Sequence, residues 1–208
     1  VSSLNVINTS SQTQEFFGTL YNGDGTQLGF ANTSLGDAIA AGGRVVVTSA
    51  ELESLFQTST WSGPAVLEVT GSASFDSVIK LRSPSGLVSN TNCTRQGRVD
   101  NIEGGSANGR TFIRFINTGD TTISSIQGTL TITENGSVRQ SSQELISSLA
   151  PKASAWKNGD EISQLFNESW SGAASMTISS SSNLRLLNLN FVNEETFFNF
   201  SCYESSAE

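Results

Sequence analysis

The pattern of apolar and polar positions along the chain predicts short β-strands over most of its length. Apolar or β-branched residues alternate with polar ones in short runs bounded by Gly, Asn, Asp and Ser. The predicted strands cover 4–9, 15–22, 27–34, 43–48, 64–70, 75–82 and 86–93, and then 111–117, 123–133, 137–143, 152–157, 173–180, 184–191 and 195–202. Seven short strands in about a hundred residues are typical of an antiparallel β-sandwich.

The same sequence pattern occurs twice along the chain. Ile7-Asn8-Thr9 recurs as Ile116-Asn117-Thr118, Gly18-Thr19-Leu20 as Gly128-Thr129-Leu130, and Trp61-Ser62-Gly63 as Trp170-Ser171-Gly172, at an offset of about 109 residues. A constant offset over almost the whole chain indicates a tandem of two homologous modules. The duplication is also an internal control, because a residue kept in both copies is expected to serve the fold.

Each copy interrupts its strands with one predicted short helix. Thr48 and Glu51 in the first copy, and Asn158 and Glu161 in the second, have capping-box spacing. Apolar residues at helical spacing follow, and we expect each helix to close one end of its sandwich. The aromatic residues near these helices are read as core or scaffold: the duplicated Trp61 and Trp170 as scaffold aromatics, and Trp156, which aligns with Val46, as core.

The predicted domains are 1–96 and 111–208, joined by a Gly-rich linker at 97–110. Four glycines and four charged residues in those fourteen positions leave little to build a core. A short strand at 98–102 is the alternative. The second copy offers nothing to match such a strand, because only 203–208 follow its last predicted strand.

One segment of each copy carries a family resemblance. Leu35 to Val47 is an apolar stretch followed by Ala41-Gly42-Gly43 and Val45-Val46-Val47, and Leu145 to Trp156 has Pro151 in its turn. This pattern resembles a hairpin of immunoglobulin-like repeats in bacterial or archaeal extracellular surface and filament proteins. The resemblance implies an all-β chain of two tandem homologous antiparallel β-sandwich domains, each with one short helix. It implies an adhesive, scaffold or filament role and brings no active-site residues.

Composition limits the partners and the location. Eleven Lys and Arg against nineteen Asp and Glu give a net charge of −8, which repels phosphate backbones, so no nucleic-acid partner is expected. No run of about 18 apolar residues occurs, so no membrane span is expected. Ser and Thr make up about a quarter of the chain, as in secreted β proteins, and the chain begins as a mature exported product would. We therefore expect an extracellular or cell-surface protein.

Candidate catalytic and metal-binding residues are few. The chain has no His, the usual base for a Ser or Cys nucleophile and the commonest zinc ligand. Asp24, Glu51, Glu68 and Asp76 show no convergent spacing, so a non-enzyme without a cofactor is predicted. Asn22-Gly23-Asp24-Gly25 contains part of a calcium loop but lacks the further acidic ligands, which favours a tight turn.

Six sequons mark candidate N-glycosylation sites, at Asn8, Asn32, Asn92, Asn135, Asn167 and Asn199. Strand alternation predicts that Asn199 and Asn92 face solvent, opposite a face that carries Phe198, Phe200 and Cys202.

The two cysteines, Cys93 and Cys202, occupy matching places in the two copies. Three readings stay open. They are buried small hydrophobes, or they bond to each other, or they form bridges between subunits. A bond between them requires equivalent positions of the two copies to meet about a pseudo-twofold axis, with Cα atoms within about 7 Å.

Two functional hypotheses follow. The first is a non-enzymatic structural subunit of a filament or surface fibre, a homopolymer assembled head to tail by strand addition, with Leu4, Val6 and Ile7 of the first strand as the subunit contact. The second is a secreted carbohydrate-binding or adhesive tandem module that binds glycans through an exposed aromatic such as Tyr21. An enzyme ranks third.

Overall fold

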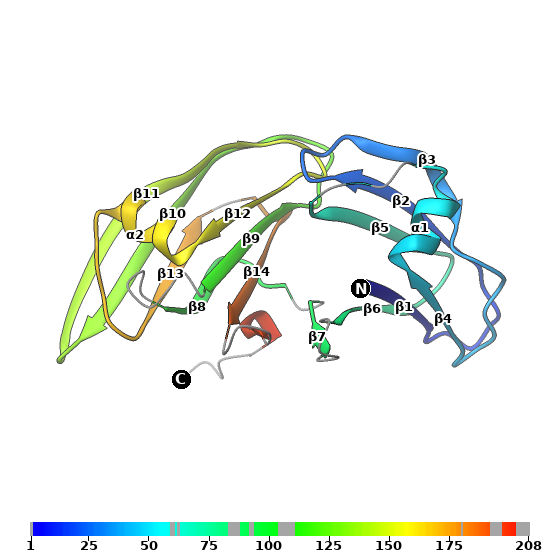
Figure 1. The fold of residues 1–208 in the computed structure, drawn as a ribbon, viewed down its shortest axis with the longest axis horizontal. Coiled ribbons are helices and arrows are strands. Elements are labelled where there is room, and N and C mark those ends of the chain that lie inside the picture. The colour runs from blue at the N-terminus through cyan, green and yellow to red at the C-terminus, as the bar shows by residue number, and fades with distance from the viewer. Residues whose placement is uncertain are drawn as a thin grey trace. The chain divides into compact units, whose positions relative to one another are not determined.

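The computed structural model describes residues 2–58, 61, 63–82, 88–91, 94–103, 111–179, 181–191 and 197–202. This part of the chain is mostly β, with four antiparallel sheets and two short α-helices (Figure 1). It divides into two compact units, Val1–Asn92 and Cys93–Glu208, here called unit 1 and unit 2. Neither described helix has the length and apolar character that a membrane crossing requires.

Unit 1 consists of two sheets whose strand orders are β4-β1-β6-β7 and β3-β2-β5. Residues of both sheets meet in one apolar core, which includes Val6 of the first sheet and Leu20 of the second. The elements are β1 (Ser2–Asn8), β2 (Phe16–Asn22), β3 (Gln27–Ser34), β4 (Arg44–Thr48), α1 (Ser49–Leu55), β5 (Ala65–Gly71), β6 (Phe75–Arg82) and β7 (Val88–Asn90).

In the described residues, unit 2 repeats this arrangement with one strand more. Its sheets have the orders β12-β9-β14-β15 and β11-β10-β13-β8, and its core lies between them. The elements are β8 (Arg98–Glu103), β9 (Thr111–Asn117), β10 (Ile123–Glu134), β11 (Ser137–Leu149), β12 (Ser154–Asn158), α2 (Gly159–Phe166), β13 (Ala173–Ser179), β14 (Leu184–Phe191), β15 (Phe197–Asn199) and a 3₁₀ turn at Phe200–Cys202.

The strand order differs from that of an immunoglobulin sandwich, in which the first two strands pair with each other. Here β1 pairs with β4 and β6, while β2 pairs with β3 and β5 in the other sheet. The predicted hairpin at Leu35 to Val47 is likewise a crossover, because β3 and β4 belong to different sheets. The same holds for Leu145 to Trp156, between β11 and β12.

Most predicted strands agree with the observed ones to within two residues. β11 runs six residues beyond the predicted 137–143, β7 ends three residues before the end of the predicted 86–93, and the last predicted strand, 195–202, ends at Asn199. After β15 the chain turns into the 3₁₀ segment, so the alternation of faces ends at Asn199. Phe198 is 55% exposed, Asn199 is half-buried and Ser201 is buried. The predicted faces of this segment are therefore wrong. Phe198 already faces solvent within β15, and beyond Asn199 the 3₁₀ turn does not keep the two-residue period of a strand.

Both predicted capping boxes are confirmed. In α1 the Thr48 Oγ1 accepts the backbone N–H of Glu51, and the Glu51 carboxylate accepts the backbone N–H of Thr48 at 2.7 Å. Asn158 and Glu161 make the same reciprocal pair at the start of α2. These bonds satisfy N–H groups that the first helical turn leaves unpaired. Leu52, Phe56, Ile162 and Phe166 are buried, which places the apolar stripe of each helix on its core.

The duplicated asparagine of the Ile-Asn-Thr motif organises a turn in each unit. Asn117 is completely buried, and its Nδ2 donates to the carbonyl oxygens of Thr121, Leu149 and Ala150 at 2.8–3.1 Å. Asn8 is equally buried, and its Nδ2 donates to the carbonyl oxygens of Gln12 and Ile39. A glycan at Asn8 would occupy this nitrogen inside the core, so the fold has no room for the candidate glycosylation site at Asn8.

The predicted linker at 97–110 is partly a strand. Its residues 98–103 form β8, which pairs with β13 and places Val99 and Ile102 in the core of unit 2. Residues 104–110 lie outside the described part. The division between the units comes at 92, not 96, and β8 belongs to unit 2. The Gly-rich composition concealed the two apolar residues that decide this placement.

The predicted subunit contact strand is an interior strand. β1 is hydrogen-bonded on one edge to β4 and on the other to β6. Leu4 and Val6 are buried in the core of unit 1, and Ile7 is half-buried. The assignment of Leu4, Val6 and Ile7 to a subunit contact is therefore wrong, because β1 has no free edge to offer.

We expect Asn117→Ala to lower the free energy of unfolding by about 2–3 kcal/mol, because it leaves several buried backbone groups without their partner. Urea denaturation followed by circular dichroism measures this loss. Gln143→Ala, at an exposed position of β11, is the control and should change stability by less than about 0.5 kcal/mol. Equal stability of the two variants would contradict the role given to Asn117.

Candidate functional site

The two units differ most clearly at one edge of one sheet. In unit 2, β8 pairs with β13, with Val99 opposite Met176 and Ile102 opposite Ala174. The strand β13 therefore has a neighbour on each side, β10 and β8. In unit 1, β5 is paired with β2 and forms the edge of its sheet within the described part of the chain. No described strand of unit 1 takes the place that β8 has in unit 2.

The inner face of β5 is more exposed than that of β13. The duplicated glycines Gly18 and Gly128 pair with Val69 and Ile178, so these two pairs align β5 of unit 1 with β13 of unit 2. By this alignment Ala65, Leu67 and Val69 correspond to Ala174, Met176 and Ile178. The three residues of unit 2 are buried, whereas those of unit 1 are only half-buried.

The facing strand β6 shows the same difference. The alignment of Asn8 with Asn117 makes Ser77, Ile79 and Leu81 the counterparts of Leu186, Asn188 and Asn190. All three counterparts in β14 are buried. In unit 1, Ser77 is exposed, Ile79 is 38% exposed and Leu81 is half-buried. We call the six residues the open face of unit 1: Ala65, Leu67, Val69, Ser77, Ile79 and Leu81.

Strand β8 fills the corresponding place in unit 2 in three ways. Its side chains Val99 and Ile102 are 2% and 0% exposed and complete the core. Its backbone pairs with β13 across a register shift, where Asn101 has a φ of 58°. Its carbonyl oxygens at Asp100 and Asn101 accept hydrogen bonds from the Nδ2 groups of Asn188 and Asn190.

The duplicated tryptophans, Trp61 and Trp170, also differ in burial between the two units. The indole Nε1–H of Trp170 donates to the carbonyl oxygen of Ile102 in β8 at 3.0 Å, and the ring is buried. Trp61, at the equivalent position, is half-buried against the core of unit 1. Both rings pack on a core. The two differ in burial because the strand that receives the Trp170 indole has no described counterpart in unit 1.

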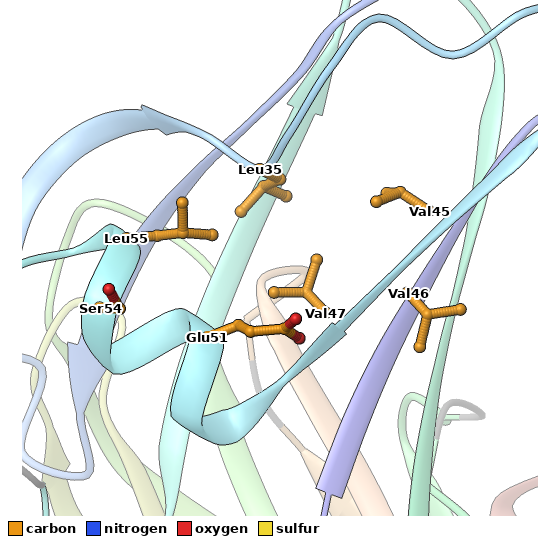
Figure 2. A pocket seen from close by; sticks show the side chains of 7 residues that line it. All are labelled: Leu35, Val45, Val46, Val47, Glu51, Ser54 and Leu55. Atoms are coloured by element: carbon orange, nitrogen blue, oxygen red, sulfur yellow. The ribbon is translucent and has the colours of Figure 1, made fainter.

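A separate apolar hollow lies between β4 and α1 (Figure 2). It has a volume of about 290 Å³ and is lined by Leu35, Val45, Val46, Val47, Glu51, Ser54 and Leu55. Its one charged group, Glu51, caps the helix, and the hydrogen bonds from the backbone N–H and then the Oγ1 of Thr48 lower the pKa of this carboxyl. An ionised, committed carboxylate next to aliphatic side chains does not form a proton-transfer site.

The candidate calcium loop is a tight turn. The backbone N–H of Gly25 donates to the Asn22 carbonyl, and the Asp24 carboxylate accepts the backbone N–H of Thr26 at 2.8 Å. That hydrogen bond is the main cause of the lowered pKa of Asp24. The carboxylate therefore serves its own turn. In the described residues, no three Cys, Asp or Glu side chains gather as a metal site would need.

The remaining aromatic candidates lie on sheet surfaces. Tyr21 is half-buried, with its hydroxyl 3.4 Å from a Glu68 carboxylate oxygen. Trp156 is not part of the core as expected. It is half-buried, packs edge-on against Phe112, and lies under the guanidinium of Arg114, 5.5 Å from the ring centre. Burial lowers the pKa of Arg114 to about 10, which leaves it charged at neutral pH.

The remaining sequons and the cysteines are placed unequally. Asn32, Asn135 and Asn167 are exposed, and Asn199 is half-buried. Asn92 and Cys93 lie outside the described residues, as does the side chain of Cys202. The three readings of the cysteines therefore stay predictions.

No protein-family model matches the chain, and searches of curated proteins and of solved structures find no significant match. The two units of the chain are therefore the comparison that locates the site. Sequence reasoning missed the open face. The available signal was Ser77 in a strand whose counterpart has Leu186 there, together with the apolar Val99 and Ile102 inside the supposed linker.

We expect Trp170→Phe to destabilise the protein by about 1–3 kcal/mol, because the buried carbonyl of Ile102 loses its donor. Trp61→Phe removes the equivalent indole from a half-buried site and should lower stability by less than about 1 kcal/mol. Urea denaturation of both variants tests the comparison. An equal loss in the two variants would contradict the difference between the units.

Glu51→Gln should remove a pH-dependent part of the stability. A carboxyl whose folded pKa is lowered stabilises the fold above its ordinary value of 4.5, and that contribution is lost as the pH falls through the lowered pKa. Thermal unfolding should show a higher Tm for wild type than for the variant at pH 7, and the difference in Tm should shrink toward pH 3. Glu53→Gln, on the same helix, is the control. A gap that is constant with pH would contradict the assignment.

Proposed function

We propose that the chain is a non-enzymatic structural subunit of an extracellular filament or surface fibre that assembles head to tail by strand addition. The main support for this proposal is a difference in burial. In unit 2 the strand β8 covers the inner side chains of β13 and β14, whereas the corresponding side chains of unit 1, the open face, are half-buried or exposed. The resemblance to tandem repeats of bacterial or archaeal surface proteins supports the same class, although the strand pairing is not that of an immunoglobulin sandwich.

The strand β5 lies at the edge of its sheet within the described residues. Backbone groups at the edge of a sheet are a template for pairing with another strand. Half-buried Leu67 and Val69 add an apolar surface that gains free energy when it is covered. A contact in which one surface of a subunit meets a different surface of the next one is heterologous, and it propagates into a fibre when its rotation does not close.

The residues with candidate chemistry support a structural role. Glu51 and Asp24 hold a helix cap and a turn, and the chain contains no His. Trp170 is buried and Tyr21 is half-buried, so neither offers a full ring face for a sugar. The high Ser and Thr content supports the extracellular location that we propose.

Electron microscopy of the natively purified protein tests the proposal, and we expect fibres or short oligomers. Light scattering over a range of concentrations should show mass increasing with concentration. The exposed Val138→Asp variant, changed far from the open face in sequence, should assemble as wild type does. A strictly monomeric native protein at all concentrations would end the filament proposal.

A further inference from the structure

We propose that Asn135 is a site of spontaneous covalent modification, at which the side-chain amide is lost as ammonia and the residue becomes aspartate or isoaspartate. The Asn135-Gly136 pair forms the turn of the hairpin between β10 and β11 in unit 2 (Figure 1). The reaction needs only water and the glycine that follows the asparagine. It concerns the chemistry of one turn and is independent of the proposed function.

The reaction begins with an attack by the main chain on the side chain. The backbone nitrogen of Gly136 gives up its proton and bonds to Cγ of Asn135, which closes a cyclic imide and expels the Nδ2 group as ammonia. Water that adds at Cγ then breaks the Cγ–N bond and gives aspartate. Water that adds at the main-chain carbonyl carbon breaks the C–N bond there and gives isoaspartate. Glycine obstructs the attack least, because it has no Cβ.

Both residues of this turn are accessible. Asn135 and Gly136 are exposed, and apart from its chain neighbours no atom lies within 4 Å of the place that a Cβ on Gly136 would occupy. Among the described residues, none makes a hydrogen bond with the Asn135 side chain. The amide group can therefore turn toward the Gly136 nitrogen without losing a partner.

The backbone of the turn slows the reaction without preventing it. Asn135 has a φ of 50° and Gly136 a φ of 77°, as a two-residue hairpin turn requires, and Glu134 pairs with Ser137 on either side. Ring closure needs rotation of the main chain away from this conformation, so the turn must first open locally. Exposed loop tips are among the parts of a fold that open at the lowest free energy.

The pair Asn158-Gly159 is the same dipeptide in a protected place. The Asn158 Oδ1 accepts the backbone N–H of Glu161 at 2.8 Å as the cap of α2. Gly159 is buried, and a Cβ on it would lie 3.0 Å from the carbonyl oxygen of Glu103. Attack on Cγ at this position requires the cap and the first turn of the helix to come apart. We therefore expect little reaction at Asn158 in the folded chain.

The pair Asn22-Gly23 is protected in another way. The Asn22 Oδ1 accepts the backbone N–H of Gly23 at 2.8 Å, which holds the proton that the attacking nitrogen must lose. The backbone N–H and carbonyl of Asn22 are bonded to Thr26 and Gly25, and the pair is half-buried. This main chain cannot rotate unless its turn breaks. The pair Asn108-Gly109 lies outside the described residues.

The modification changes the charge and the backbone at this end of unit 2. The Glu134 carboxylate accepts the backbone N–H and the hydroxyl of Ser171, and Arg139 pairs with Glu134 and Glu168. These bonds tie the hairpin to the segment that follows α2. The reaction adds a carboxylate next to Glu134, and isoaspartate lengthens the main chain of the turn, so the pairing of Glu134 with Ser137 is lost. We expect the tie to weaken.

Peptide mapping by mass spectrometry tests the inference on the full chain, produced without glycans and incubated at pH 8. In the folded chain we expect conversion at Asn135 at least about tenfold faster than at Asn22 and Asn158, because only its turn opens easily. In concentrated urea the three sites should react at similar rates, because the dipeptide is the same and the folded surroundings are gone. Isoaspartate methyltransferase should label the peptide that contains residue 135.

Two variants serve as controls. Ser137→Ala keeps the Asn-Gly pair but removes the sequon at Asn135, so it should convert at the wild-type rate whether or not the host attaches glycans. Asn135→Asp carries the new charge without the lengthened main chain. The incubated protein should therefore have a lower Tm than Asn135→Asp, and an equal Tm would contradict the weakening by isoaspartate.

Two results would overturn the inference. The first is conversion at equal rates at Asn22, Asn135 and Asn158 in the folded chain, which would show that the fold does not select the site. The second is no conversion at Asn135 in the folded chain over a time in which the unfolded chain converts fully.

Discussion

The core of each unit lies between two sheets. Its apolar side chains are shielded from water only where other strands cover the inner faces of both sheets. In unit 2 the strand β8 meets this constraint through Val99 and Ile102. In unit 1 the same inner positions, among them Leu67 and Ile79, stay partly open. The two units share the same arrangement of sheets, and among the described residues they differ by the strand β8.

The free energy that a strand would gain by covering the open face can be estimated from its apolar side chains. Burying a Val or Ile side chain is worth about 1.5–3 kcal/mol, so two such residues supply a gross gain of a few kcal/mol. Part of this gain is offset by ordering an extended peptide. A free peptide is therefore expected to bind weakly, whereas a donor held in place within a polymer gains from high effective concentration.

The duplication separates structural residues from the rest by direct comparison. Asn8 and Asn117 are kept in both copies because each one satisfies a buried turn, and the capping residues of α1 and α2 are kept because each pair begins a helix. The residues that differ between copies, such as Ser77 against Leu186, mark where the units meet different surroundings. A sequon or a Gly-rich composition was a weaker guide, since Asn8 is buried and residues 98–103 form a strand.

Most of the strands, both helices and the internal repeat follow from the sequence, because the two-residue and 3.6-residue periods and the capping boxes are local properties of the chain. The pairing of the strands follows from the tertiary structure alone. It placed β1 in the interior of its sheet, put Arg98–Glu103 beside β13, and left β5 at an edge. These outcomes depend on contacts between residues far apart along the chain, such as Val99 on Met176, which no local pattern encodes.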